Sequence, residues 1–382
     1  MTTLEYLRER QLNPRKILAS GTHQGWKRSL LVESFPLACR ERPLCFGQSD
    51  KVFSSLWLSE HQVLCGTKDN QVLLYDTVVS KLIKIPTIPR PLGFRGEQCT
   101  SPRSGMHSLA RSPSGDMLAA GGENVRDVAF YRLPSLDPYA LGLGHQDWIF
   151  ALKWLNDDII LSGSRDHRLS VWSLANTREG SVMSPVASYC FADSDLVRDM
   201  ALCQRKQEVA LLSPNGRLAF MNVSVMVKVH TVQTPAITDN VCVTINADQS
   251  MYAVGSSDCF LLADTCCCLW RRRVALPCGI QAVRSLAFQD HLLTVGCGSG
   301  EVLTYDTRNE KYLGSLSSPA KLVPRQGYMR ASDLLEYQAH IGNNRIFQAV
   351  YTVAHSPSAQ QLFVAGGPLN APFFGNFASI YQ

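Results

Sequence analysis

A repeating pattern of strands and glycines constrains the fold of this chain more than any other feature of its sequence. One unit consists of an apolar strand, a turn, a second strand that ends in glycine, a short polar loop, and a third strand that ends in an aromatic residue. In three units the glycine and the aromatic residue are separated by the same nine positions: Gly66 to Tyr75, Gly163 to Trp172 and Gly296 to Tyr305. A constant register between separate units is typical of repeat architectures.

Weaker units bring the total to seven. The second strand of the second unit ends at Gly121, 42 residues before Gly163, and that of the fifth unit ends at Gly255, 41 residues before Gly296. Units of about 40–45 residues, with three inner strands and a more variable outer strand, are typical of WD-repeat β-propellers. The alternative, a two-sheet sandwich, requires no fixed period. The sequence therefore predicts an all-β fold, a seven-bladed WD-repeat β-propeller.

The two ends of the repeat region indicate how the ring would close. The chain reaches Gln382 at the third strand of the seventh unit, so this blade lacks an outer strand. Segment 43–46 is placed to supply that strand and to fasten the ends together. Residues 1–42 would then precede the propeller of residues 43–382 as a short helical extension. One helix is predicted at LEYLRERQ, with Leu4, Tyr6 and Leu7 on one side, and another around 26–32.

Two segments interrupt the repeats. Segment 87–104 is rich in Pro, Arg and Gly, and segment 314–347 separates the sixth and seventh units. We expect both to be irregular loops on the rim of the ring, where long connections tend to carry function or disorder.

The composition argues against several functional classes. The apolar stretch 259–270 is interrupted by Asp264 and is too short to span a bilayer, and the N-terminus has no apolar signal core, so we expect no membrane partner. A net charge of +5 is too small to indicate a nucleic-acid partner. The thirteen cysteines contain no C-x-x-C pair, and the run 266–268 is contiguous, so we expect reduced thiols without a metal or cofactor. The sequence contains no Walker A, G-x-S-x-G or H-E-x-x-H motif, and we expect a binding protein rather than an enzyme.

The topology of a propeller assigns each loop to a face of the ring. In every blade the first strand begins and the second strand ends at one face, here called the top face, and the third strand ends at the bottom face. Five basic residues occupy top-face positions near the axis: Lys51, Lys68, Arg165, Arg198 and Arg284. Cations that converge on a concave rim favour an anionic guest, and arginine can bind a carboxylate bidentately. The sequence thus predicts a basic pocket suited to the acidic end of a peptide.

Local ion pairs are the alternative explanation for these cations. Arg165 with Asp166 and Lys68 with Asp69 would each be held within a single loop. On the bottom face, Tyr305-Asp306-Thr307-Arg308 fits an aromatic-Asp-x-Arg motif after the third strand of the sixth unit. An arginine that closes a β-turn explains this motif about as well as a binding role.

The sequence segments that contain these features resemble those of one family. SDKVFSSLWL, HQVLCGTKDN, FYRLPSLDP, GHQDWIFALKW, SMYAVGSS and LFVAGGPL are similar to segments of DDB-and-cullin-associated factor twelve and its like-proteins. These proteins are WD-repeat substrate receptors of cullin-four RING ubiquitin ligases, and the similarity covers nearly the whole chain.

The resemblance implies that adaptor binding and substrate binding take place at different sites of the protein. The N-terminal helices, with Leu4, Tyr6 and Leu7, would dock on the ligase adaptor, a DDB-type propeller protein that links to cullin-four and the RING subunit, helped by Arg308. The five top-face cations match the family's basic pocket, which takes C-terminal degrons that end in paired glutamates. Ubiquitin transfer would belong to other subunits, and the protein is expected in the cytoplasm and the nucleus.

One departure concerns the pocket. The family has Lys-x-Arg where this chain has Leu196-Val197-Arg198, so one cation of six is missing. We expect this loss to weaken binding of paired glutamates without abolishing it. The alternative function is a general WD-repeat scaffold that binds peptides without a ligase.

Overall fold

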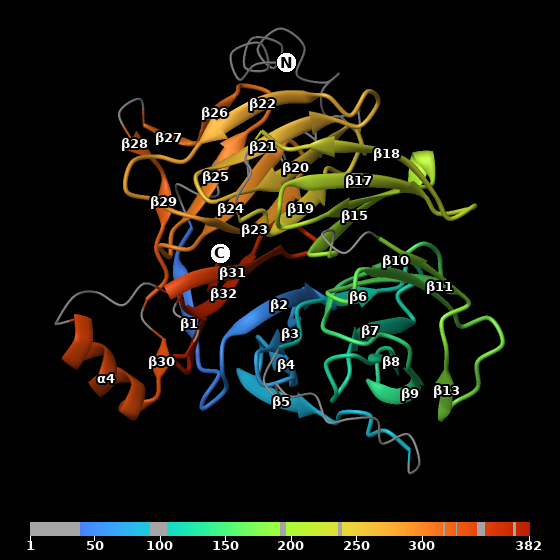
Figure 1. Cartoon of the computed structure of the whole chain (residues 1–382). Helices are drawn as coiled ribbons and strands as arrows, with labels where there is room; N and C mark the ends of the chain where they lie inside the picture. Colours follow the sequence, from blue (N-terminus) through green and yellow to red (C-terminus); the bar gives the residue numbers. More distant parts are fainter. Residues whose placement is uncertain are drawn as a thin grey trace, which may run out of the picture.

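Seven antiparallel sheets lie side by side around a central axis in the computed structural model (Figure 1). The structure describes residues 39–91, 105–191, 196–235, 239–315, 318–325, 327–341, 348–369 and 372–382. The first strand of each sheet lies nearest the axis, and the sheets follow one another around the ring in chain order (Figure 1). The predicted seven-bladed β-propeller is confirmed.

The first four blades follow the repeats closely. Their first strands are β2 (Val52–Trp57), β6 (Leu109–Arg111), β10 (Ile149–Trp154) and β15 (Asp199–Cys203). Their second strands are β3 (Gln62–Thr67), β7 (Met117–Gly121), β11 (Ile159–Ser164) and β16 (Glu208–Leu212), and a 3-10 turn at Gln204–Lys206 precedes the last of these. Their third strands are β4 (Val72–Asp76), β8 (Val128–Arg132), β12 (Arg168–Ser173) and β17 (Arg217–Asn222). Their outer strands are β5 (Lys81–Ile85), β9 (Asp137–Gly142), β14 (Ala187–Cys190) and β18 (Val227–Gln233), and β13 (Ser181–Met183) pairs in parallel with β9.

The last three blades are less uniform. Blade 5 contains β19 (Cys242–Ile245), β20 (Met251–Gly255), β21 (Cys259–Asp264) and β22 (Trp270–Ala275). Blade 6 contains β23 (Val283–Gln289), β24 (Leu292–Cys297) and β25 (Val302–Asp306), and its outer edge is shared by β26 (Lys311–Tyr312) and β29 (Lys321–Leu322). Blade 7 contains β31 (Gln348–His355), β32 (Leu362–Pro368), β33 (Gly375–Tyr381) and, from the start of the described chain, β1 (Glu41–Leu44).

The repeated glycine lets adjacent blades approach each other. A Cβ on Gly163 would lie 2.4 Å from Cγ1 of Val197, in the next blade. A Cβ on Gly296 would lie 2.6 Å from Cγ1 of Val350, again in the next blade. Real Cβ atoms do not come so close, so the period of the glycines follows from the packing between blades.

Blade 3 contains a buried hydrogen-bond network around its closing tryptophan. Ser162 Oγ accepts a hydrogen bond from Trp172 Nε1 at 2.8 Å and lies 2.6 Å from His145 Nε2, while His145 Nδ1 lies 2.8 Å from Asp166 Oδ2. Burial by itself raises the pKa of the Asp166 carboxyl, but its hydrogen bonds with His145 and with the backbone N–H of Gln146 hold that pKa below its usual value. The network ties the first three strands of the blade together through groups that would be costly to bury unpaired.

The ring closes through β1, which pairs antiparallel with β33 from Glu41 opposite Tyr381 to Leu44 opposite Ala378. The closing strand therefore lies two residues earlier than predicted: Cys45 and Phe46 follow it. Phe46 is instead buried, with its ring 5.7 Å from that of Tyr75 in blade 1. The strand extends toward the N-terminus because Arg40 and Gln382 continue the ladder through their backbone N–H and C=O groups.

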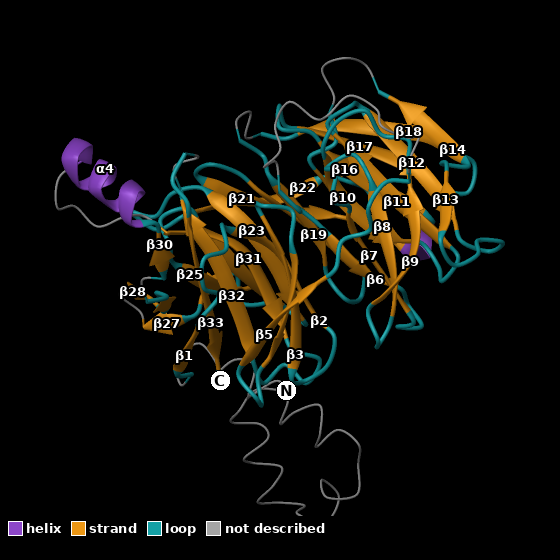
Figure 2. Ribbon diagram, turned by 90° about the horizontal axis from the view of Figure 1, so that it is seen from below, coloured by secondary structure: helices purple, strands orange, loops and turns teal. Residues whose placement is uncertain are grey.

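The segment between blades 6 and 7 has more structure than an irregular loop. A short hairpin of β27 (Gly314–Ser315) and β28 (Ser318–Pro319) precedes β29, and β30 (Tyr328–Met329) pairs with β33. Helix α4 (Ala331–Ile341) follows, and it projects from the body of the ring (Figures 1 and 2). Segments 92–104 and 342–347, and residues 1–38 with both predicted helices, lie outside the described residues, so the division into 1–42 and 43–382 stays a prediction.

The described residues contain no helix long and apolar enough to cross a bilayer. Every cysteine among them is a free thiol. Cys266, Cys267 and Cys268 lie in the turn after β21, and the described chain has no cluster of three or more His, Cys, Asp and Glu residues that could hold a metal ion.

Candidate functional site

A β-bulge near the start of the first strand turns one side chain of the blade toward the channel. In β2 the register shifts between Val52 and Ser54, in β10 between Ile149 and Ala151, in β23 between Val283 and Ser285, and in β31 between Val350 and Thr352. The extra residues are Phe53, Phe150, Arg284 and Tyr351, and all four line one pocket. A bulge of this kind redirects a side chain without disturbing the strand on either side.

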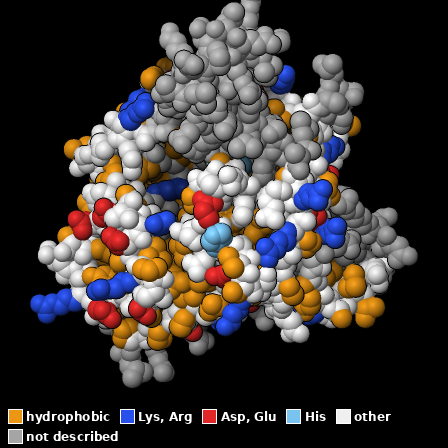
Figure 3. All heavy atoms as spheres, turned by 180° about the vertical axis from the view of Figure 1, so that it is seen from behind, with side chains coloured by type: hydrophobic (Ala, Val, Ile, Leu, Met, Phe, Trp, Pro, Cys, Tyr) orange, Lys and Arg blue, Asp and Glu red, His pale blue; other side chains and the backbone are white. Residues whose placement is uncertain are grey.

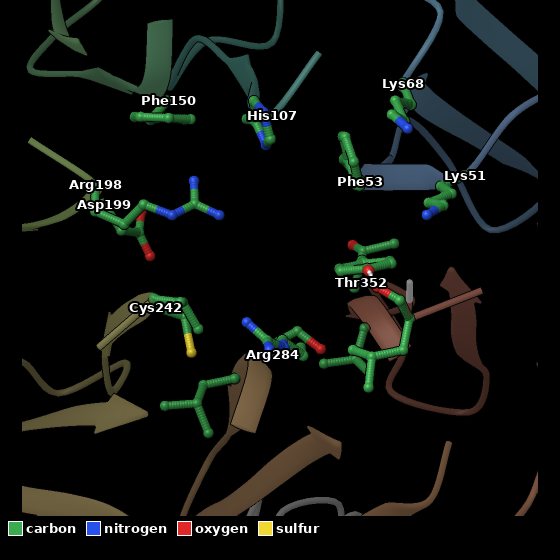
Figure 4. Close-up of a pocket in the computed structure, with 16 residues that line it drawn as sticks. Lys51, Phe53, Lys68, His107, Phe150, Arg198, Asp199, Cys242, Arg284 and Thr352 are labelled. Carbon is green, nitrogen blue, oxygen red and sulfur yellow. Dashed lines mark hydrogen bonds between the residues drawn. The ribbon is translucent and has the colours of Figure 1, made fainter. Parts of the chain in front are cut away.

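The pocket is a cavity of about 310 Å³ at the mouth of the channel (Figure 4). Its cations come from three blades: Lys51 and Lys68 from blade 1, Arg198 from blade 4 and Arg284 from blade 6. Lys51 and Lys68 lie on one side of the cavity and Arg198 lies on the other (Figure 4). By contrast, on the face opposite to the one seen in Figure 1, Lys and Arg side chains lie among Asp and Glu (Figure 3).

The structure brings four of the five predicted cations together and leaves Arg165 outside the lining of the pocket. The guanidinium of Arg165 lies over the Trp148 ring at 5.0 Å, and its Nε is 3.6 Å from Asp147 Oδ2. Its side chain remains 49% exposed. Because Trp148 is itself next to Phe150, with ring centroids 6.2 Å apart, Arg165 lies one side chain away from the pocket.

The ion pairs seen for two of these cations, Lys68 and Arg165, are with other carboxylates than the ones that we considered. Lys68 Nζ lies 3.8 Å from Asp50 Oδ2, and Asp69 instead accepts hydrogen bonds from the Thr67 hydroxyl and the Gln71 amide. Asp166 belongs to the His145 network rather than to Arg165. The carboxylates that do approach the cations come from the residues just before the first strands, or at their start, which the loop pattern does not reveal.

The two arginines of the pocket have no hydrogen-bond or ion-pair partner for their guanidiniums among the described residues. The guanidinium of neither Arg198 nor Arg284 makes a hydrogen bond or ion pair with this part of the chain, and Nε of Arg284 is buried without an acceptor. Arg198 stacks on the Phe150 ring at 4.4 Å. Burial lowers the pKa of Arg198, the neighbouring carboxylate of Asp199 opposes that shift, and the charge of Arg284 adds to it. Two half-buried cations that repel each other favour the arrival of an anion.

Lys51, which is buried, and Asp199, which is partly buried, are further charges at this site. Lys51 is 2% exposed, and burial together with the charge of Lys68 lowers its pKa to about 8, against the attraction of Asp50 and Asp333. Asp199 accepts hydrogen bonds from the backbone N–H groups of Val243 and Met200, but burial raises its pKa. The pocket thus combines four basic groups with the carboxylate of Asp199, while Asp50 lies beside Lys68 outside the lining; sequence reasoning missed both carboxylates.

Aromatic side chains form the rest of one wall, and sequence reasoning missed them as well. The rings of Phe53 and His107 stack with centroids 4.7 Å apart, Tyr351 meets Phe53 edge-on at 5.1 Å, and Phe150 meets His107 edge-on at 4.9 Å. A sequence signal for part of this wall exists: Phe53, Phe150 and Arg284 each precede the residue that pairs with the second-strand glycine. The repeat register could therefore have identified these three positions.

Arg308 lies at the far end of blade 6 from the pocket, because β25 ends opposite to the end of β24. Its side chain is exposed, and its backbone N–H donates to Asp306 Oδ1 at 2.8 Å. The turn is thus closed by the Asp306 carboxylate and not by the guanidinium, which makes no hydrogen bond with the described chain. The role of Arg308 in adaptor binding stays a prediction, and its proposed partners Leu4, Tyr6 and Leu7 lie outside the described residues.

A comparison with known families agrees with this geometry. The model of a family described as the DDB1- and CUL4-associated factor 12 beta propeller matches residues 35–188 and 181–382. The match includes every described strand and all the residues that line the pocket, and it confirms the resemblance found in the sequence.

Proposed function

Because the chain belongs to the DDB1- and CUL4-associated factor 12 β-propeller family, we propose that it is a non-catalytic substrate receptor of a cullin-four RING ubiquitin ligase. In this proposal the top-face pocket binds the C-terminus of a substrate that ends in paired glutamates. The observation that carries it is the convergence of Lys51, Lys68, Arg198 and Arg284 on one cavity, with two guanidiniums that make no hydrogen bond or ion pair with the described chain.

The chemistry of such an end fits the charges of the pocket. A peptide that ends in Glu-Glu presents three carboxylates within a few ångströms, and both arginines can donate two parallel hydrogen bonds to a carboxylate. Each charge-assisted hydrogen bond to a buried group contributes about 1.5–3 kcal/mol. Two or three such contacts sum to about 3–9 kcal/mol, part of which offsets the cost of association, so further contacts of the peptide must add to the affinity.

Of the proposed adaptor contacts, Arg308 lies away from the pocket. Segment 1–42 and Arg308 would bind the DDB1-type adaptor and, through it, cullin-four and the RING subunit. The substrate would then be held on the opposite side of the ring from the adaptor, and ubiquitin would be transferred by the RING subunit and its partner enzyme. We place this activity in the cytoplasm and the nucleus, which imaging of the tagged protein would test.

A pair of peptides tests the pocket directly. A peptide that ends in Glu-Glu with a free carboxylate should bind at least about tenfold more tightly than the same peptide with an amidated end, because amidation removes one charge-assisted contact. Fluorescence polarisation with labelled peptides measures both affinities. Equal binding of the two peptides would rule out the carboxylate pocket.

Binding of the acidic peptide should weaken as the pH rises from 7 to 9.5. Glutamates stay charged over this range, whereas Lys51, with its pKa near 8, loses its proton. The affinity should fall by roughly tenfold, the value of one charged contact, and the Lys51→Met variant should bind weakly at both pH values.

Folding stability should change with pH in the opposite direction. The pKa of Lys51 in the folded protein lies below its value of 10.5 in the unfolded chain, so the unfolded chain holds the extra proton between about pH 8 and pH 10.5. This residue therefore adds stability as the pH rises through that window.

For peptide binding, a pH-independent affinity in the unmodified protein would contradict the proposed role of Lys51.

Arg308→Ala should reduce capture of the adaptor while leaving peptide binding unchanged. Affinity purification with mass spectrometry from cells that express each variant measures this capture. Arg205→Ala is the matched control, since Arg205 is also an exposed arginine, in the turn between β15 and β16. Normal capture by Arg308→Ala and by a chain without residues 1–38, which keeps β1, would favour a peptide-binding scaffold that has no ligase.

A further inference from the structure

We propose that the aromatic wall of the pocket is a separate subsite, which binds an apolar side chain just upstream of the acidic end of the guest. The wall, here called the aromatic arc, consists of Phe53, His107, Phe150 and Tyr351. This inference rests on the proposed function, because it names a second feature of the peptide that the same pocket would bind.

The aromatic arc is continuous from blade 7 to blade 3. Tyr351, Phe53, His107 and Phe150 follow one another with ring centroids 5.1, 4.7 and 4.9 Å apart. Edge-to-face and stacked contacts at such distances hold the rings in fixed orientations. The arc is thus a preformed surface, and a guest that covers it causes little further loss of side-chain conformational entropy.

Burial sets these rings apart from the phenylalanines in the core of the blades. Phe130, Phe220, Phe260 and Phe363 are almost completely buried between the sheets. The four rings of the arc are only half-buried, and they line the cavity. A concave apolar surface that remains open to solvent is the usual sign of a ligand site, because covering it releases hydration at little cost.

The cations lie next to the aromatic arc, and only the ring at one end is covered by a guanidinium. Arg198 lies over the Phe150 ring at one end, and Lys51 precedes the strand of Phe53. Arg284 lies across the cavity from Phe53 and His107 (Figure 4). A guest that places its carboxylates against the cations therefore has its preceding residues beside the rings, since an extended peptide advances only about 3.3 Å per residue.

The choice of a side chain follows from this surface. Leu, Met and Phe would bury apolar area against the rings, whereas Gly offers no side chain and Asp would have to be desolvated beside them. An upstream acidic residue would bind less favourably beside the rings than at the cations. Two carboxylates, Asp199 in the lining and Asp50 beside it, would repel such a residue. The preferred substrate would combine an acidic end with an apolar residue directly before it.

The test is a set of peptides that end in Glu-Glu and differ only at the third or the fourth residue from the end. Leu or Phe at one of these positions should bind about tenfold more tightly than Gly, which is the expected gain from burying one such side chain. Phe53→Ala should remove most of this preference, so that its affinities for the Gly, Leu and Phe peptides become nearly equal. Trp148→Ala is the matched control, because Trp148 is a half-exposed ring that does not line the pocket, and it should keep the preference.

The outcomes separate the two proposals. If acidic peptides bind but Gly, Leu and Phe are equivalent at both positions, the apolar subsite is wrong and the receptor function stands. The subsite is also wrong if Phe53→Ala keeps the full preference while its thermal denaturation shows a folded protein. If no peptide with an acidic end binds at all, the proposed function itself fails, and the subsite fails with it.

Discussion

Replacing Arg198 and Arg284 together by alanine should abolish measurable binding of peptides that end in Glu-Glu. Each guanidinium contributes about 1.5–3 kcal/mol when it meets a carboxylate in a partly buried site, so the double variant should lose more than about 100-fold in affinity. Isothermal titration calorimetry measures the loss. Folding should not suffer, because neither guanidinium makes a hydrogen bond or ion pair with the described chain and their burial is a cost to the fold.

A third arginine provides the control for this double variant. Arg165 has the same charge and also belongs to the top face, but it is half exposed and lies beside Asp147. Arg165→Ala should change the affinity by less than about threefold, as expected for a screened surface charge. Equal losses for Arg165→Ala and Arg284→Ala would mean that the guest is held by the overall potential of the face and not by contacts in the cavity.

Removing residues 40–46 should prevent the propeller from forming a stable ring. This deletion removes β1 with its ladder to β33 and exposes the sites of Leu44 and Phe46, which are 8% and 2% exposed. The two side chains contribute about 1.5–3 kcal/mol each and the backbone hydrogen bonds about 0.5–1.5 kcal/mol each. Their sum approaches the total stability of a typical domain, so we expect little soluble protein and no cooperative thermal transition.

Point variants separate this effect from the shortening of the chain. Phe46→Ala should lower the free energy of unfolding by about 3–5 kcal/mol, as is typical of a large buried aromatic residue. Cys45→Ser is the matched control, because the Cys45 side chain is exposed between two buried neighbours, and it should leave the thermal midpoint unchanged. A deletion variant with an unaltered midpoint would show that blade 7 is complete without β1.

The sequence was sufficient for the fold because the packing of a propeller is periodic. Gly66, Gly163 and Gly296 occur at a fixed distance from their aromatic partners because each glycine lies where the next blade approaches most closely. The same periodicity put Lys51 and Arg284 on the correct face. The closing strand was placed two residues too late, since the pattern contains no signal for where an edge strand begins.

The site was less accessible to sequence reasoning, because loop positions fix a face but not the direction of a side chain. Arg165 follows its glycine as Lys68 does, yet it turns toward Trp148 and Asp147. His107 lacks a strong repeat around it, and Asp199 looked like part of a first strand rather than part of the pocket. Helix α4 was missed because its helical character is local and belongs to no repeat.

The bulges in the first strands separate what the protein recognises from what keeps it folded. Phe53, Phe150, Arg284 and Tyr351 each occupy a place outside the pairing register, while the residues on either side hold the sheet. Exchanging one of them changes the lining of the mouth and leaves the strand pairing within each blade intact. Substitutions at these positions, one blade at a time, can therefore adapt the same scaffold to guests of different charge and shape.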